Sequence, residues 1–488
     1  MRIVFATAEV SPIAKTGGLG DVCGSLPKAL RELGHEVVIF MPMYRQAREW
    51  FAKNNVEPEP LGERFMLSWA DWTTDIRFFR TSLPGTDIPL VLTENQFLFE
   101  RPHIYSPRPD GSDDYLERYT IFCRAVINAC ERFQFAPDIL HAHDWHTALL
   151  PVYLHSGLRG SEVFRNTRSV FTIHNLNYQG VAGSDQLRHL GLHSRYWAPD
   201  AIEHFRDVNL MKGGIMMADQ VTTVSPNYAH EIRTPEHGAG LDGVLREVWW
   251  KVTGILNGID TEEWNPATDS LLEANFEAGH LHGKAISKRM LAKEAGLEHR
   301  PTAPLIGVVS RLVDQKGFQL LIPVMHRLID AGAQFVVLGS GDPRFEEAFA
   351  QIAAQRPDAA KAWLTFDNSL AHRIYAGSDM LLMPSIYEPC GLNQMYALRY
   401  GTIPVVRMTG GLADTVTPFD GTNLPQANGF GFFGQSPSEL YTATWLSMLN
   451  YKDPGLWNTL QFTGMREDFS WHRSAREYEA VYRRALGW

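Results

Sequence analysis

Residues 15–21 read Lys-Thr-Gly-Gly-Leu-Gly-Asp and follow a short apolar run over residues 1–6 that predicts a buried strand. We expect a helix next, over residues 25–33, ending at Gly34, because glycine favours the position just after a helix. Glycine lacks a Cβ, so the backbone N–H groups of such a turn can approach a phosphate or a sugar. A strand, a glycine turn and a helix in this order indicate an α/β fold. A turn that needs glycine only for its shape would look the same.

Strands and helices alternate along the chain in two series, separated by a loop-rich stretch of mixed charge over residues 257–302. The pattern predicts two doubly wound α/β domains with a cleft between them, and ligands at the carboxyl ends of the strands. Residues 466–488 carry an apolar stripe and are expected to form a helix that packs on a domain. The expected strands span residues 3–8, 36–41, 139–143, 169–174 and 220–225 in the first series, and 304–309, 334–339, 380–383 and 402–406 in the second.

The composition excludes several classes of protein. A chain of 488 residues with a net charge of −10 disfavours broad binding to nucleic acid, which requires a basic surface. Its four cysteines form no CxxC pair and are too few for a disulfide framework. No apolar stretch approaches the roughly 20 residues needed to cross a membrane, and the N-terminus does not look like a signal peptide. We therefore expect a cytoplasmic protein without a membrane partner.

A nicotinamide-dependent dehydrogenase is an alternative interpretation of the glycine turn, but the spacing disfavours it. Residues 18–24 contain G-x-G, yet the third glycine comes one position late. The acid expected after the second strand is absent, since residues 41–44 read Met-Pro-Met-Tyr. Lys15 within the turn is also not what a dinucleotide requires.

The second series contains a candidate site for a nucleoside-diphosphate sugar. Arg311 and Lys316 follow one strand, Glu388 follows another, and residues 409–412 form a second glycine turn. Cations and free N–H groups near a helix start can bind anions, and a carboxylate can accept hydrogen bonds from sugar hydroxyls. Taken singly, the cations could be solvated surface residues and the acid a helix cap. Their combination at the carboxyl ends of the strands favours the site.

Several motifs in the same order give the chain a resemblance to bacterial glycogen synthases and plant starch synthases, glycosyltransferase family 5, over essentially its full length. The motifs lie at residues 15–22, 141–146, 172–175, 178–180, 224–226, 256–260, 310–317, 388–392 and 409–416.

The resemblance implies a GT-B fold, with two Rossmann-like domains over residues 1–255 and 256–465 and the C-terminal helix, 466–488, packing back on the first. It implies transfer of glucose from ADP-glucose to the non-reducing 4-hydroxyl end of an α-1,4-glucan, with retention of configuration and without a metal or other cofactor. It also implies that the site is complete only when the cleft closes.

The resemblance also assigns roles to residues. The expected catalytic residues are Lys15, His174, Arg311, Lys316 and Glu388. The expected donor-binding residues are Lys15, Gly18, Asn257, Phe366, Cys390, Gly391, Leu392, Thr409, Gly410 and Gly411. The expected acceptor-binding residues are Asp21, Tyr105, Asp144 and Trp145, with the indole of Trp145 offering a flat apolar face to a sugar ring.

Six positions need separate comment. The histidines at 141, 143 and 146 invite a metal interpretation, but no acidic second shell accompanies them, so no metal site is expected. Phe366 stands where the family commonly has an adenine-stacking tyrosine, which preserves the π face but not the hydroxyl. His103 stands where glycine is frequent, so acceptor binding is less defined than the reaction. Tyr396 replaces the second acid of glycosyltransferases with paired glutamates, which supports the glycogen and starch synthase branch.

Two other functions remain open at this point. A related GT-B transferase with another donor or acceptor would carry many of the same motifs. A catalytically silent glucan-binding protein would not need the combination of Lys15, His174, Arg311, Lys316 and Glu388.

Overall fold

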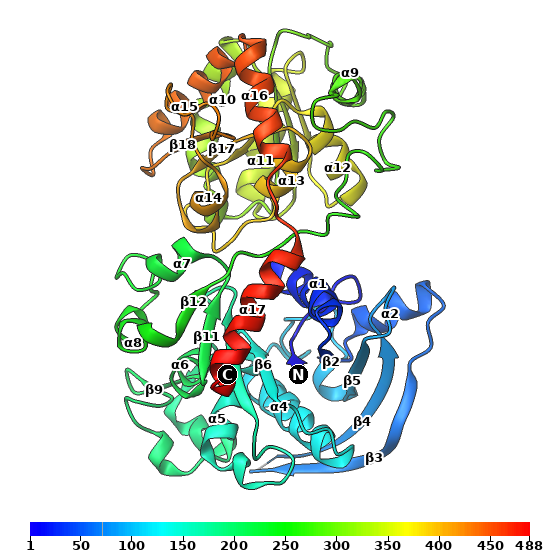
Figure 1. The fold of residues 1–488 in the computed structure, drawn as a ribbon, viewed down its shortest axis with the longest axis vertical. Coiled ribbons are helices and arrows are strands. Elements are labelled where there is room, and N and C mark those ends of the chain that lie inside the picture. The colour runs from blue at the N-terminus through cyan, green and yellow to red at the C-terminus, as the bar shows by residue number, and fades with distance from the viewer. Residues whose placement is uncertain (71) are drawn as a thin grey trace. The chain divides into compact units, whose positions relative to one another are not determined.

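The computed structural model describes residues 1–70 and 72–488. The chain divides into two compact units, one formed by residues 1–258 with 471–488 and the other by residues 259–470 (Figure 1). The sequence predicts both boundaries a few residues earlier, at 255/256 and 465/466. Asn257 therefore belongs to the first unit, although the sequence places it in the second.

A nine-stranded sheet forms the centre of the first unit. Seven strands are parallel, and a hairpin of two long strands extends one edge in antiparallel pairing. Numbered along the chain, the parallel part has the order 3-2-1-4-5-6-7, the arrangement of a doubly wound fold. From one edge to the other, the strands are β12 (Val252–Gly254), β11 (Gln220–Thr223), β7 (Arg168–Ile173), β6 (Ile139–His143), β1 (Arg2–Ala6), β2 (Glu36–Pro42), β5 (Pro89–Glu94), β4 (Trp72–Ser82) and β3 (Glu59–Trp69).

Helices and short elements complete the first unit. Its α-helices are α1 (Gly18–Glu32), α2 (Arg45–Lys53), α3 (Gln96–Phe99), α4 (Tyr115–Arg132), α5 (Leu149–Ser156), α6 (Leu210–Met217), α7 (Pro226–Glu231), α8 (Asp242–Glu247) and α17 (Trp471–Leu486). Its 3-10 turns are η1 (Trp145–Thr147), η2 (Leu158–Gly160), η3 (Ser184–Leu190), η4 (Ser194–Tyr196) and η5 (Trp249–Lys251). A small antiparallel sheet joins β8 (Val181–Gly183), β10 (Asp207–Asn209) and β9 (Glu203–His204).

The last helix, α17, lies beside the first helix, α1, within this unit (Figure 1). The apolar stripe read from the sequence explains the packing, because Tyr478 and Tyr482 are fully buried. Polar contacts reinforce it, including His472 Nδ1 with a carboxylate oxygen of Glu32 at 3.2 Å. The C-terminal helix is therefore part of the first unit's core.

The second unit is built on a six-stranded sheet in which every pairing is parallel. Its strand order, 3-2-1-4-5-6 along the chain, is that of a dinucleotide-binding fold. The strands, in sheet order, are β15 (Ala360–Trp363), β14 (Gln334–Leu338), β13 (Leu305–Val309), β16 (Met380–Met383), β17 (Ile403–Arg407) and β18 (Phe430–Phe432). The helices are α9 (His282–Glu294), α10 (Phe318–Asp330), α11 (Pro343–Gln355), α12 (Asn368–Gly377), α13 (Asn393–Arg399), α14 (Gly410–Thr415), α15 (Pro437–Asn450) and α16 (Pro454–Met465), with the 3-10 turn η6 (Asp314–Lys316).

In both units the strand order reverses beside the first strand, between β1 and β6 and between β13 and β16. Ligands of open parallel sheets bind outside the carboxyl ends of the strands at such a switch point. The loops that follow these four strands are therefore the positions where the fold brings functional residues together.

Three expectations about local structure are wrong. The first helix begins at Gly18 and not at residue 25, so most of the glycine-rich stretch is helical rather than a separate turn. The supposedly loop-rich stretch of residues 257–302 contains α9, a helix of 13 residues. The C-terminal helix begins at Trp471 and not at residue 466, since residues 466–470 are not helical. Among the described residues, no helix is long and apolar enough to cross a membrane.

Candidate active site

The glycine-rich segment of the first unit is organised around Glu9, a residue that the sequence analysis did not select. Glu9 follows β1 and its side chain is buried. One carboxylate oxygen accepts the backbone N–H groups of Thr16 at 2.6 Å and Gly17 at 3.2 Å, and the other accepts the Thr16 hydroxyl at 2.8 Å. A buried carboxylate therefore sets the shape of the segment just before α1. The sequence signal for Glu9 is an acid a few residues beyond a buried strand, which is not distinctive.

The glycines of this segment serve different purposes. A Cβ at Gly20 would lie 2.5 Å from Cβ of Lys15, so glycine is required there for close packing. A Cβ at Gly17 or Gly18 would meet no atom of the described residues within 4 Å, and neither residue has a positive φ. Packing and backbone conformation therefore do not explain the missing side chains at 17 and 18, whereas close approach of a ligand would.

Lys15, a predicted donor-binding residue, lies next to Asp21, a predicted acceptor-binding residue. Lys15 Nζ is 2.7 Å from Oδ1 of Asp21, and both side chains are partly exposed. The ammonium group is thus held at the start of α1 by a carboxylate three residues into the helix. A partly exposed pair of this kind contributes little to stability, so Lys15 remains available to a negatively charged ligand.

Asp144 and His174 come together because β6 and β7 are neighbouring parallel strands that end side by side. Asp144 follows β6 directly and has a positive φ of 54°, which is costly for a residue other than glycine. Its carboxylate accepts the backbone N–H groups of His174 at 2.7 Å and Asn175 at 3.4 Å. Burial raises the pKa of the Asp144 carboxyl to about 7, with these two backbone hydrogen bonds acting in the opposite direction.

His174 belongs to a buried cluster of imidazoles. Its Nε2 lies 3.0 Å from Nδ1 of His143, and the rings of His141 and His143 are 4.0 Å apart, as their positions on one face of a strand predict. Burial lowers the pKa of His174 to about 3 and that of His143 well below its usual value. Both rings are therefore neutral at pH 7, so one donates its single proton to the other.

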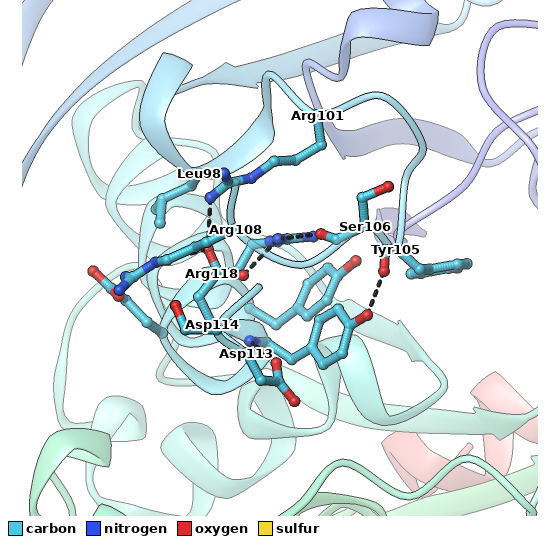
Figure 2. Close-up of polar contacts among 12 residues, drawn as sticks. Leu98, Arg101, Tyr105, Ser106, Arg108, Asp113, Asp114 and Arg118 are labelled. Carbon is cyan, nitrogen blue, oxygen red and sulfur yellow. Dashed lines mark hydrogen bonds and ion pairs between the residues drawn. The ribbon is translucent and has the colours of Figure 1, made fainter. Parts of the chain in front are cut away.

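Tyr105 lies on a loop, residues 101–114, that is fixed by a buried ionic cluster. Asp114 accepts from Arg101 at 2.7 Å and from Arg118 at 2.5 Å, and Arg108 lies within 3.4 Å of it (Figure 2). Arg118 is fully buried and also donates to two carbonyl oxygens of the loop (Figure 2). These ion pairs and hydrogen bonds tie the loop to α4.

The Tyr105 side chain is held from two sides. Its hydroxyl lies 2.5 Å from Glu9 Oε1, and its ring stacks on His146 with ring centroids 5.2 Å apart. Trp145 in turn lies against His146, at 4.1 Å between ring centroids. Tyr105, Trp145 and the glycine-rich segment therefore form one continuous cluster through Glu9 and His146.

Trp145, which the sequence predicts to offer a flat apolar face to a sugar ring, is only 8% exposed. A Cβ on Gly180 would lie 2.4 Å from the ring, so the loop that carries Gly180 covers one face of the indole. The ring does border a cavity of about 680 Å³ within this unit. Its lining also includes the aromatic residues Trp72, Tyr115, Tyr178 and His189, and the polar residues Asp113, Asn177, Gln179 and Gln186.

In the second unit, the loops after β13 and β16 bring Lys316 and Glu388 together. Lys316 Nζ lies 2.6 Å from Glu388 Oε2, and the Ser385 hydroxyl donates to the same oxygen at 2.9 Å. Glu388 is buried, and Lys316 is mostly buried. A Cβ at Gly317 would lie 1.9 Å from the carbonyl oxygen of Pro384, so glycine is required where the two loops cross. Arg311, by contrast, is exposed and takes no part in this pair.

The second glycine turn packs directly on the loop that carries Glu388. The N–H of Gly411 donates to the carbonyl oxygens of Glu388 at 3.1 Å and Pro389 at 3.2 Å. Gly410 has a φ of 46°, and a Cβ there would lie 1.8 Å from the Glu388 carbonyl oxygen. The remaining predicted residues of these two turns, Cys390, Gly391, Leu392 and Thr409, lie beside this contact at the starts of α13 and α14.

Two predicted donor-binding residues lie apart from these clusters. Phe366 follows β15 and is 81% exposed, so its ring is open to stacking. Asn257 is buried in the first unit, and its Oδ1 has no hydrogen-bond partner among the described residues.

Comparisons with known proteins match the chain on both sides of its domain boundary. Residues 2–247 match the starch synthase catalytic domain family, and residues 292–440 match glycosyl transferases group 1. A glycogen synthase of Geotalea uraniireducens is 43% identical over 487 residues, covering 100% of this chain and 99% of the relative. A glycogen synthase of Lactobacillus acidophilus is 42% identical and covers 100% of both chains.

The chain belongs to the glycogen and starch synthase family. A solved structure described as the catalytic domain of starch synthase IV from Arabidopsis thaliana bound to ADP and acarbose has a TM-score of 0.89 and 37% identity. It covers 100% of this chain, which shows that the family's GT-B fold extends over the whole sequence. A sucrose-phosphate synthase from Thermosynechococcus elongatus shares the fold alone, with a TM-score of 0.61 and 17% identity.

Membership of the glycogen and starch synthase family confirms the predicted family and fold, and makes the chain a glucosyltransferase. The roles of individual residues are a separate matter. The two clusters described above, around Glu9 and around Glu388, contain most of the residues that the sequence selects.

Proposed function

We propose that this chain transfers glucose from ADP-glucose to the non-reducing 4-hydroxyl of an α-1,4-glucan, with retention at the anomeric carbon. The observation that carries the proposal is the Lys316–Glu388 pair, on the loops that follow β13 and β16 at the switch point of a parallel sheet. The relatives that match over the full length are named glycogen synthases, and the solved starch synthase IV domain was bound to ADP and acarbose.

The donor is assigned mainly to the second unit. Lys316 and the exposed Arg311 supply positive charge for the diphosphate, with backbone N–H groups of the turns at 390–392 and 409–411. Glu388 accepts hydrogen bonds from glucose hydroxyls, and Phe366 stacks on the adenine. Lys15, Gly18 and Asn257 of the first unit complete donor binding. Because protein cations supply the charge, we expect transfer to continue with a chelator such as EDTA present.

The reaction breaks the bond between the anomeric carbon and the diphosphate and forms a new bond to the acceptor 4-oxygen on the same face. The proton of the acceptor hydroxyl passes to the leaving diphosphate, so the products are ADP and a glucan longer by one unit. His174, neutral because burial lowers its pKa to about 3, places dipoles rather than a charge beside the developing positive charge. Asp144 positions His174 by accepting its backbone N–H.

The acceptor chain is assigned to the first unit, with Asp21, Tyr105, Asp144 and Trp145 at its non-reducing end. The cavity bordered by Trp145 would hold the next glucose units, because its lining combines aromatic faces with amide and carboxylate groups that suit sugars.

Tyr178, 60% exposed on the wall of this cavity, should stack on one of these glucose units. Replacing Tyr178 by Ala should then raise KM for long glucans more than for maltose. Phe205→Ala, an exposed aromatic outside the cavity lining, is the matched control.

The central test is incorporation of labelled glucose into glycogen. Glu388→Ala and Lys316→Ala should abolish incorporation from ADP-glucose while the protein remains folded, whereas the exposed Lys293→Ala should not change it. Full activity in either of the first two variants would contradict the site assignment. Retention is checked by NMR of the new glycosidic bond, and a trapped glucosyl-enzyme adduct would contradict same-face attack.

A further inference from the structure

Glu9 connects two segments that the proposed function uses in different ways. Its carboxylate binds the residues that precede α1, the donor side of the first unit, through Thr16 and Gly17. The same carboxylate contacts the Tyr105 hydroxyl, on the acceptor side, at 2.5 Å. Glu9 is only 3% exposed, so this connection lies beneath the surface that a substrate would touch.

The chemistry of the four contacts fixes the direction of each hydrogen bond. An ionised carboxylate can only accept, and a backbone N–H can only donate. Oε2 accepts the two N–H groups, and Oε1 accepts the hydroxyls of Thr16 and Tyr105. The single proton of the Tyr105 hydroxyl is therefore committed to Glu9. Only the lone pairs of the phenol oxygen remain for a ligand.

Tyr105 cannot easily escape this arrangement by turning. Its ring is stacked on His146, and its backbone carbonyl accepts a hydrogen bond from the Tyr115 hydroxyl (Figure 2). Burial, with the nearby charge of Glu9, raises the pKa of Tyr105 well above its usual value, so the phenol keeps its proton at neutral pH.

We propose that Glu9 is a positioning residue that makes Tyr105 a hydrogen-bond acceptor for a hydroxyl of the glucan, while holding the glycine-rich segment in place. The inference rests on the proposed function, in which Tyr105 contacts the acceptor. A sugar hydroxyl can donate or accept, so a protein group that only accepts selects one orientation of that hydroxyl. Glu9 thereby contributes to acceptor recognition without touching the glucan.

The variant Glu9→Gln separates this role from a purely structural one. Its amide oxygen can take the place of Oε2 and keep both backbone N–H bonds. Its NH₂ group would then stand in place of Oε1 and donate to the hydroxyls of Thr16 and Tyr105. The segment would remain held, but Tyr105 would accept from the amide and point its proton outward. Glu9→Ala would remove both functions at once.

The experiment measures the dissociation constants of maltooligosaccharide and of ADP by calorimetry, without turnover, for the wild type and for Glu9→Gln, Tyr105→Phe and the double variant. Glu9→Gln should weaken maltooligosaccharide binding roughly 3- to 10-fold, the loss of about one hydrogen bond, and leave ADP binding and the melting temperature nearly unchanged. Adding Tyr105→Phe to Glu9→Gln should cause little further loss, because both act through one hydroxyl. Glu94→Gln, which replaces another buried carboxylate of this unit, is the matched control and should change neither constant.

Unchanged maltooligosaccharide binding in Glu9→Gln would overturn the inference, as would equal losses for both ligands or fully additive losses with Tyr105→Phe. Absence of maltooligosaccharide binding by the wild type would also overturn it. Failure of the proposed function is recognised separately, as a wild type that binds both ligands but transfers no glucose from ADP-glucose.

Discussion

The ion pair between Lys316 and Glu388 yields a quantitative prediction for Lys316→Ala. The two charges are 2.6 Å apart, which corresponds to a gross attraction of about 6 kcal/mol at an effective dielectric constant of 20. Desolvation opposes most of this attraction. Removing the lysine leaves a buried carboxylate with the Ser385 hydroxyl as its remaining donor within hydrogen-bonding distance among the described residues.

Breaking a buried pair in this way typically costs about 3–5 kcal/mol, and the partial exposure of Lys316 favours the lower end. We therefore expect Lys316→Ala to destabilise the second unit by about 3 kcal/mol. For a unit that spans residues 259–470, this lowers the melting temperature by roughly 6 to 12 °C. Differential scanning calorimetry of the full chain measures the effect, with Lys293→Ala as the control.

The double variant Lys316→Ala, Glu388→Gln tests the reasoning behind that number. A neutral glutamine needs no cation, so the double variant should recover part of the stability that Lys316→Ala loses. A loss below about 1 kcal/mol in Lys316→Ala would refute the account of this pair. The account would also be refuted if the stability lost in the double variant equalled the sum of the losses in Lys316→Ala and Glu388→Gln, because additive losses would show that the two groups are not coupled.

Two further predictions concern the first and second units in turn. Asp144 has a pKa of about 7 when folded and near 3.8 when unfolded, so the folded state binds the extra proton between these values. Its contribution to the free energy of unfolding is therefore fully present below pH 4 and lost as the pH rises to about 7. The stability difference between Asp144→Asn and the wild type should change over this range, and a difference constant with pH would contradict the shift. Gly410→Ala would bring a Cβ to 1.8 Å from the Glu388 carbonyl oxygen, so it should weaken ADP binding and lower the melting temperature by several degrees more than Gly421→Ala. Gly421 also has a positive φ but no described atom within 4 Å of a Cβ, and equal effects of the two variants would contradict the steric argument.

The buried parallel strands are the elements that the sequence predicts best. Residues 139–143 and 380–383 form β6 and β16 with the predicted bounds, because a short apolar run bounded by polar loops is typical of a buried strand. The start of α1 was misjudged, since three glycines in four positions indicate a turn, whereas the helix begins among them. The long hairpin of β3 and β4 went unpredicted, because few of its residues are buried and its pattern is mixed.

For the site, too, the sequence predicts some residues and not others. The order of motifs selects Lys316 and Glu388, but only the strand order 3-2-1-4-5-6 explains how two residues 72 positions apart meet. Glu9 escaped prediction because an acid after a strand has no distinctive pattern, and its role depends on Thr16, Gly17 and Tyr105 converging on it in space. Likewise, the limited exposure of Trp145 depends on Gly180, on a loop 35 residues away, and no local pattern signals it.

The most direct test of the proposed function is a donor competition assay with glycogen as acceptor. Labelled ADP-glucose is supplied with an excess of unlabelled UDP-glucose, and then the label and the competitor are exchanged. The proposed function predicts that glucose enters glycogen from ADP-glucose, that UDP-glucose competes weakly, and that Glu388→Ala eliminates the signal. Transfer from UDP-glucose alone, or no transfer to glycogen from either donor, would contradict it.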